Sequence, residues 1–267
     1  MFTDLLPSHL TPFADILPWA VVCVFVSHLF GFFIRGAFGF GSNLPIVLLT
    51  TWMLGPHHAI ILVVLTSLIA QIHLLPQGLK TADWEVAKPL LVGTIIGVAA
   101  GTWLFVILAA DWLTLIMGLL VTWIVLMDRL RLLERLGRWT DLRSRTVTSL
   151  LSVTSSTVGT VSGGGGLFFL VVYLKLACKT PVTLRGTNLV LSGTFLAFRA
   201  LFIAIAGLVS QHLLVEAALL VPIVFLGTWT GTRFFQTSSA ERFYAGLQLL
   251  LLCAAFALIG KGIAQLL

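Results

Sequence analysis

Residues 159–176 read GTVSGGGGLFFLVVYLKL, in which four glycines, Gly163 to Gly166, are followed directly by a short apolar segment. Each glycine destabilises a helix by about 1 kcal/mol relative to alanine, so four in succession are expected to end a helix. The segment that follows, Leu167 to Leu176, is too short to cross a bilayer alone, because a spanning helix needs about 20 residues. This stretch therefore predicts a helix that is broken inside an apolar protein.

The composition of the whole chain is that of a membrane protein. Of its 267 residues, 58% are hydrophobic and 10% are charged, and the mean hydropathy is +1.07. A soluble domain carries about 25% charged residues, so we expect one transmembrane domain over residues 1–267. The net charge of +6 does not indicate a nucleic-acid partner, because the Lys and Arg residues lie between apolar runs, where they orient a membrane protein.

Ten apolar segments are separated by proline, glycine or charged residues. The segments at Leu44 and Leu167 are short, and each either crosses the membrane or pairs with the preceding segment as a re-entrant hairpin. In chain order the ten are Trp19 to Ile34, Leu44 to Leu54, Ala59 to Leu75, Pro89 to Leu108, Leu113 to Met127, Thr146 to Val158, Leu167 to Leu176, Leu189 to Ala206, Val215 to Phe234 and Phe243 to Ile259.

The basic residues predict an orientation in the cell inner membrane. If the N-terminus lies outside and each segment crosses, all of the 16 Lys and Arg residues except Arg199 and Lys261 lie on the cytoplasmic side. Such asymmetry agrees with the positive-inside rule and places both termini outside. If the two short segments form re-entrant hairpins, every other connection stays on the same side of the membrane. Arg35 then lies at a hairpin tip at membrane depth, which requires a neighbouring water-filled cavity.

Four features recur in the same order in the two halves of the chain. An odd number of crossings in each half makes the second copy inverted, as in many secondary transporters. For Gly-x-x-x-Gly alone, close helix packing is an equally good explanation. The pairs are residues 36–43 with 159–166, Pro56 with Pro181, Gly78-Leu79 with Gly207-Leu208, and Gly97-x-x-x-Gly101-Thr102 with Gly227-x-x-x-Gly231-Thr232.

The expected fold is therefore an all-α polytopic membrane protein. It consists of two inverted repeats of about five apolar segments each, residues 16–127 and 146–260, joined by a basic cytoplasmic connection, residues 128–145. Broken or re-entrant half-helices are expected at the two glycine-rich motifs.

These breaks are the expected substrate site, because the free N-H groups and the dipole at a helix N-terminus attract anions. Hydroxyl and amide side chains near the breaks would add ligands, although each Ser or Thr is as well explained by a bond to its own helix backbone. The expected substrate-binding residues are Gly39, Gly41, Ser42, Asn43, Ser162, Gly163, Gly164, Gly165, Gly166, Thr187, Asn188 and Arg199.

Three basic side chains carry further expectations. Arg199 lies inside an apolar run, where a cation marks either an anion path or gate, a structural pair with Glu216, or snorkelling to the surface. His28 and Arg35 are candidates for proton transfer or gating, and packing is the competing explanation for His28. The sequence contains no nucleophile elbow, P-loop, HExxH motif or metal-ligand cysteine spacing, so we expect neither an enzyme nor a metal or other cofactor.

Several motifs together resemble the TauE/SafE family of sulfite exporters. They are the glycine-rich stretches Gly36 to Pro45 and Gly159 to Leu167, the tetrad Arg185-Gly186-Thr187-Asn188 and the two Gly-x-x-x-Gly-Thr helices. By position, the family signature falls on Gly39, Gly41, Asn43 and Gly163 to Gly166, and its Gly-Thr element falls on Gly186 and Thr187. The first half reads Ile61-Leu62 at the corresponding place, which predicts that the second half dominates binding.

The resemblance implies a secondary carrier that exports a small anion such as sulfite, sulfoacetate or another sulfonate. Alternating access around a midplane site is the expected mechanism. An anion channel would use the same helix dipoles and is the main alternative, and a membrane scaffold or insertase is a third. The expected partners are a small anion and the lipid bilayer, and a homo-oligomer is compatible with the sequence.

Overall fold

The computed structural model describes residues 12–13, 16–38, 42–130, 144–164, 167–235 and 240–266. Within these residues, all regular secondary structure is helical, and each of the ten expected apolar segments is found as a helix. The first half contains α1 Pro18–Phe38, α2 Asn43–Leu54, α3 Pro56–Thr81, α4 Trp84–Ile107 and α5 Ala110–Arg129. The second half contains α7 Arg145–Val161, α8 Leu167–Ala177, α9 Pro181–Ile205, α10 Gln211–Phe235 and α11 Ala240–Leu266.

Local sequence explains where several helices begin. Pro56 and Pro181 occupy the first turns of α3 and α9, where a missing N-H leaves no hydrogen bond unmade. Thr180 and Thr183 form a capping box ahead of α9. The Asp83 side chain accepts hydrogen bonds from the backbone N-H groups at the start of α4.

Five of the described helices are long and apolar enough to cross a membrane, or six if the bent α3 is counted as one span. The axis of α3 turns by 61° between Pro56–Ile72 and Leu74–Thr81. Pro76 lies within α3 and has no N-H to donate to the carbonyl of Ile72, which accounts for the bend. With 12 and 11 residues, α2 and α8 are too short to cross.

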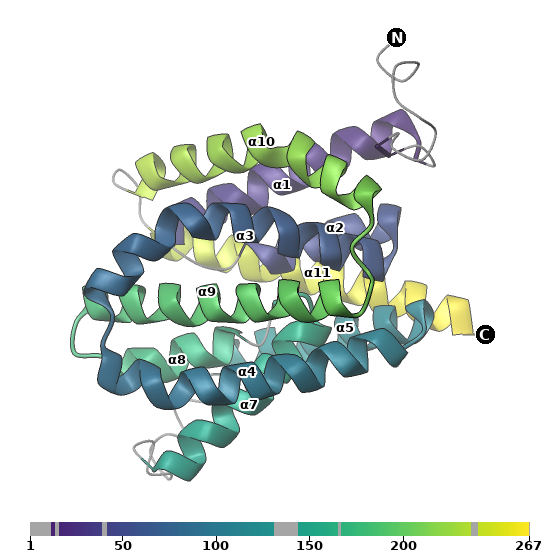
Figure 1. Ribbon diagram of the computed structural model, residues 1–267. Helices are drawn as coiled ribbons and strands as arrows, with labels where there is room; N and C mark the ends of the chain where they lie inside the picture. Colours follow the sequence, from purple (N-terminus) through teal and green to yellow (C-terminus); the bar gives the residue numbers. More distant parts are fainter. Residues whose placement is uncertain are drawn as a thin grey trace.

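The short helices turn back on the helices that precede them. α2 runs antiparallel to α1 and ends near the side of the molecule where α1 begins, and α8 turns back from α7 in the same way (Figure 1). Gly31 allows α1 and α2 to pack closely, because a Cβ atom there would lie 2.2 Å from a side-chain carbon of Ile46. The short length of α2 beside α1 agrees with the re-entrant arrangement, and Arg35 lies inside the protein.

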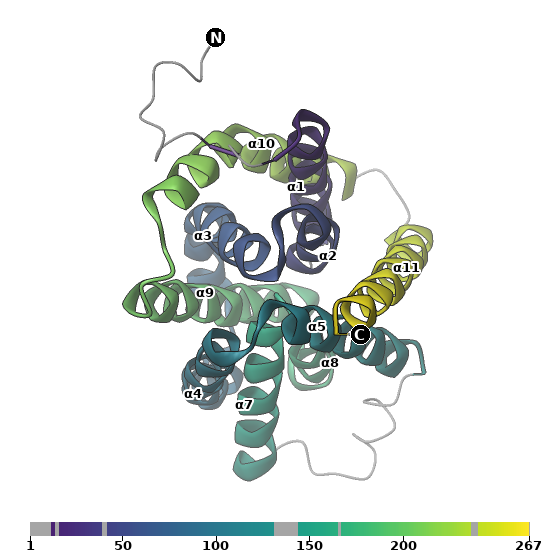
Figure 2. The same ribbon diagram turned by 90° about the vertical axis from the view of Figure 1, so that its right-hand side faces the viewer.

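The closest helix packing joins one half of the chain to the other. α1 of the first half packs along α10 of the second, and α7 of the second half packs in the same way along α4 of the first (Figure 2). α3 packs against α9, and α5 packs against α11. The contact pattern is therefore largely preserved when each helix is exchanged with its counterpart in the other half, so neither half forms a separate bundle.

Glycines allow α4 and α7, and likewise α1 and α10, to approach closely. A Cβ atom on Gly97 of α4 would lie 2.4 Å from the backbone oxygen of Val153 on α7. A Cβ atom on Gly227 of α10 would lie 2.7 Å from the backbone oxygen of Leu29 on α1. Both Gly-x-x-x-Gly motifs thus serve helix packing, one of the two explanations that the sequence allowed. Gly78 and Gly207 are not structurally equivalent, since Gly78 lies within α3 and Gly207 follows α9 with φ +72°.

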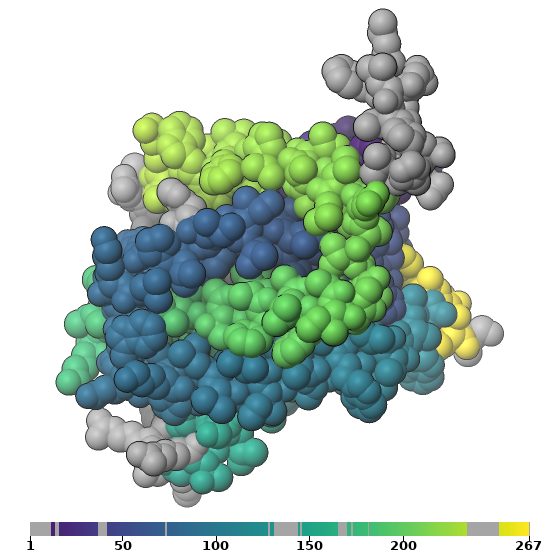
Figure 3. Space-filling model, in the orientation of Figure 1, coloured from purple at the N-terminus to yellow at the C-terminus, as the bar shows by residue number. Residues whose placement is uncertain are grey.

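The outer surface of the bundle is apolar. Val92, Ile96 and Trp103 project from α4 with exposed fractions of 62%, 55% and 66%. Figure 3 shows α4, α9, α3 and α10 forming one continuous face of the molecule. A surface of this kind suits contact with lipid, and polar side chains gather in the interior instead.

Charged side chains separate the two ends of the bundle. One end, which we call the basic end, is where α3 and α8 stop and α4 and α9 begin (left in Figure 1). The far end is where α4 and α9 stop and α5 and α10 begin. The basic end carries Lys80, Lys88, Arg129, Lys175, Lys179, Arg185 and Arg233 together with two acidic residues, Asp83 and Glu85, and the far end carries Lys261, Asp111 and Glu216.

We expect Gly97→Leu to destabilise the protein by about 1–3 kcal/mol, because the added side chain meets backbone that cannot move aside. The thermal midpoint of the detergent-solubilised protein measures this loss. Gly260→Ala is the matched control, because nothing lies within 4 Å of a Cβ atom at that position. An equal effect of the two substitutions would contradict the close packing of α4 on α7.

Candidate functional site

The two glycine-rich breaks meet inside the bundle. α7 ends at Val161, and Gly163 and Gly164 follow with φ of +79° and +122°, conformations that glycine adopts readily. A Cβ atom on Gly164 would lie 2.9 Å from the Cβ atom of Asn43, the first residue of α2. The predicted helix break is thus confirmed, and it lies against the break of the first half.

Arg35 lies at this meeting point. It projects from the last turn of α1 and is 5% exposed. Its guanidinium donates hydrogen bonds to the side-chain oxygen of Gln71 and, at 3.5 Å, to the Ser42 hydroxyl. The Ser42 hydroxyl donates to Asn43 Oδ1 at 2.8 Å, and the Ser67 hydroxyl donates to the same oxygen at 2.9 Å. Arg35, Ser42, Asn43, Ser67 and Gln71 form a polar cluster, which we call the Arg35 cluster.

Gln71 connects the Arg35 cluster to the second half. Its side-chain amide donates a 2.7 Å hydrogen bond to the backbone oxygen of Leu189 on α9. Gln71 and Ser67 lie in the middle of α3, far from either end, so the cluster lies deep in the bundle. Sequence reasoning missed both residues. The signal was present, because a glutamine within the apolar run from Ala59 to Leu75 is unusual in a membrane segment.

Among the residues that the structure describes, no acidic side chain pairs with the positive charge of the Arg35 cluster. The described bonds of Arg35 are to neutral oxygens, and its Nε has no hydrogen-bond partner. The ion pairs found among the described residues instead join Glu216 to His58 and His212. A buried cation without a counterion is unfavourable, so this cluster is suited to receive an anion.

Arg199 is a second buried cation and does not pair with Glu216, so that predicted alternative is wrong. The Arg199 side chain is 0% exposed and donates a hydrogen bond to the backbone oxygen of Thr160 on α7. Its Nε and Nη1 atoms have no partner, and its guanidinium carbon lies 5.6 Å from the centre of the Phe195 ring. Complete burial also excludes snorkelling to the surface.

The remaining predicted site residues have varied surroundings. Ser162 donates to the Val158 carbonyl of its own helix, and Thr187 donates to Thr183 and accepts from the Asp83 N-H. Asn188 is buried, and His28 is fully buried with Nδ1 2.8 Å from the Val24 carbonyl oxygen. These contacts assign Ser162, Thr187 and His28 structural bonds. The predicted residues Gly39, Gly41, Gly165 and Gly166 lie outside the described residues.

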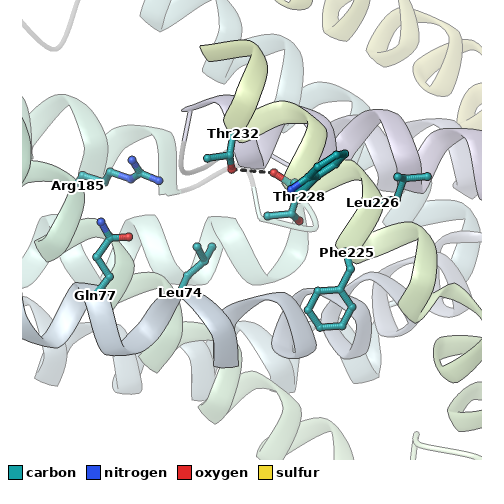
Figure 4. Close-up of a pocket in the computed structure, with 8 residues that line it drawn as sticks. Leu74, Gln77, Arg185, Phe225, Leu226, Thr228 and Thr232 are labelled. Carbon is teal, nitrogen blue, oxygen red and sulfur yellow. Dashed lines mark hydrogen bonds between the residues drawn. The ribbon is translucent and has the colours of Figure 1, made fainter. Parts of the chain in front are cut away.

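A pocket of about 720 Å³ lies between the Arg35 cluster and the basic end. Arg185 extends into it from α9, opposite Thr232 of α10, with Gln77 of α3 nearby (Figure 4). The Arg185 Nε atom is buried without a hydrogen-bond partner. The full lining is Leu74, Gln77, Arg185, Phe225, Leu226, Thr228, Trp229 and Thr232.

The pocket reaches the neighbourhood of Arg35. Leu74 lies one helical turn beyond Gln71 on α3. Thr228 also lies against Gly36, the residue after Arg35, because a Cβ atom on Gly36 would lie 2.2 Å from the Thr228 backbone oxygen. Two residues of the pocket lining, Leu74 and Thr228, therefore lie near the Arg35 cluster.

Comparison with protein families agrees with this architecture. The family model described as sulfite exporter TauE/SafE matches residues 23–258, which is most of the chain. The chain belongs to this family. The matched residues include both glycine-rich breaks, Arg35 and the tetrad at Arg185. The TauE/SafE protein is thus a multi-pass membrane protein of a transporter family, as its motifs indicated. Searches of curated proteins and of solved structures returned no match.

We expect Gly164→Ala to destabilise this TauE/SafE protein more than Gly55→Ala. Both glycines have positive φ, which costs a side chain about 1–3 kcal/mol. Only the Cβ atom at position 164 would also meet Asn43, whereas nothing lies within 4 Å at position 55. Equal shifts in the thermal midpoints of the two variants would contradict the contact between the breaks.

Proposed function

We propose that this protein is a secondary transporter that exports a small sulfur-containing or organic anion by alternating access. The observation that supports this most directly is Arg35, a buried cation without an acidic partner where two helix breaks meet. Arginine is the side chain best suited to planar or forked recognition of oxyanions. Membership of the TauE/SafE family makes sulfite the first candidate.

The chemistry of the Arg35 cluster suits a compact oxyanion. In this proposal, Arg35 provides the charge, and the side chains of Ser42, Asn43 and Ser67 turn their donors toward the anion. Backbone N-H groups at the glycine breaks, Gly39 to Asn43 and Gly163 to Gly166, complete the site. The described side chains come mainly from the first half, whereas the sequence favoured the second.

The pocket at the basic end is the proposed entry for the anion. Arg185 attracts it there, and the Arg35 cluster receives it one helical turn further in. By the positive-inside rule the basic end faces the cytoplasm, which places both termini outside the inner membrane. A negative-inside potential then favours export by about 2.3 kcal/mol per charge per 100 mV.

The proposed movement is a rocking of two inverted repeats, residues 16–127 and 146–260. The closest packing, of α1 on α10 and of α4 on α7, joins the two repeats, so in this proposal each moving body carries helices of both. Arg199 is proposed as a second binding position for the anion along the export path. It lies on the same helix as Leu189, about 15 Å further toward the far end, and keeps two donors free.

Counterflow in proteoliposomes tests the proposal. With labelled sulfite, we expect exchange that Arg35→Gln weakens by at least about tenfold in affinity, because hydrogen bonds to a charged group contribute about 1.5–3 kcal/mol. Arg129→Gln is the matched control, since Arg129 is exposed at the end of α5. Sulfoacetate and taurine in parallel assays identify the substrate, and no exchange of any of these solutes would refute the assignment.

An anion channel is distinguished in the same vesicles. A carrier is accelerated by substrate on the opposite side of the membrane, whereas flux through an open pore is not. We therefore expect trans-stimulation of sulfite uptake, and its absence together with a high conductance would support the channel.

A further inference from the structure

A buried acidic group lies at the far end of the bundle. Glu216 is 0% exposed, and its Oε2 lies 2.5 Å from His58 Nε2. Its Oε1 lies 3.3 Å from His212 Nδ1 and accepts a 3.0 Å hydrogen bond from the backbone N-H of Phe13. The two histidine side chains are 26% and 29% exposed, so protons reach them from the aqueous medium while the carboxylate stays covered.

The cluster joins the two halves of the protein. His58 lies in the first turn of α3, and His212 and Glu216 lie in the first turns of α10. Phe13, which precedes α1, covers the carboxylate and packs its ring 6.3 Å from that of Phe25. Opening this end would separate His58 from Glu216 and leave a buried carboxylate with fewer partners, which is unfavourable. The cluster therefore joins α3 to α10 at the far end.

Neighbouring titratable groups have other contacts. His57 lies beside His58, but its Nε2 lies 3.2 Å from the Phe105 carbonyl oxygen and its ring stacks on Phe105. Lys261 binds the backbone oxygens of Thr51 and Trp52. Asp111 lies in the first turn of α5. Within the part of the chain that the structure describes, the Glu216 carboxylate therefore contacts His58, His212 and the backbone N-H of Phe13.

We propose that His58, His212 and Glu216 form a proton-binding site that locks the far end shut when the medium there is acidic. Histidine is the side chain that changes charge near neutral pH. A protonated His58 forms a charge-assisted bond to Glu216, which is stronger than the bond of a neutral imidazole. Because this bond exists only while His58 and Glu216 are in contact, acidity favours the state in which α3 and α10 are joined. The inference rests on the proposed alternating access and specifies its outer gate.

Thiol labelling tests the gate without any transported solute. Leu220 lies one turn below Glu216 on α10 and is 0% exposed, packed under the cluster. Leu220→Cys is introduced after Cys23, Cys178 and Cys253 are replaced by serine. A membrane-impermeant maleimide is then applied from the side of the C-terminus, and the labelling rate with His58→Gln is divided by the rate without it. The ratio cancels the effect of pH on the thiol itself.

We expect this ratio to be about 10 at about pH 5 and near 1 at about pH 8, because glutamine keeps a neutral hydrogen bond but cannot take up a proton. His57→Gln is the matched control, with a ratio near 1 at both pH values. A ratio for His58→Gln that does not change with pH overturns the proton-binding site. Glu216→Gln provides a second variant and should abolish the pH dependence. The labelling result stands whether or not sulfite is exchanged, so failure of the gate is separable from failure of the substrate assignment.

Discussion

The contact between two broken helices is the constraint on which this structure depends. A helix that ends inside a bilayer leaves backbone N-H and C=O groups that lipid cannot satisfy. Here the breaks are placed against one another, with Gly164 against Asn43 and Gly163 against Val47. Only glycine allows this approach together with a positive φ. The described ends of both breaks are thus covered by protein and not by lipid.

The exchanged packing of the halves places this site at the centre. α7 packs along α4, and α1 packs along α10 in the equivalent way. Each hairpin is therefore packed against a helix of the other half. Glycines at 97 and 227 allow the close approach. Because the closest packing joins helices of different halves, neither half can move as a separate body without its partner helices.

The buried cationic and acidic side chains lie in different parts of the bundle. Two arginines are buried in the interior, whereas the buried carboxylate described here, Glu216, lies at the far end with its own partners. An anion at Arg35 would lower the cost of that burial, which gives transport a selective element. At the far end, the carboxylate and imidazole groups join α3 to α10. The pocket thus lies on the side of the basic end, and the bonds between imidazole and carboxylate groups lie at the far end.

The sequence by itself determined the class of protein, the ten helices and the two breaks, because these follow from apolar run length and from the backbone properties of glycine and proline. It also placed Ser42, Asn43 and Arg199 among the buried polar residues. Tertiary structure decided the rest. The side chain of Gln71 bonds to Arg35, and Glu216 pairs with His58 and not with Arg199. The sequence could not show these partners, because the bonds connect helices far apart in the chain. Local patterns carry no information on which faces of distant helices meet, and packing settles that.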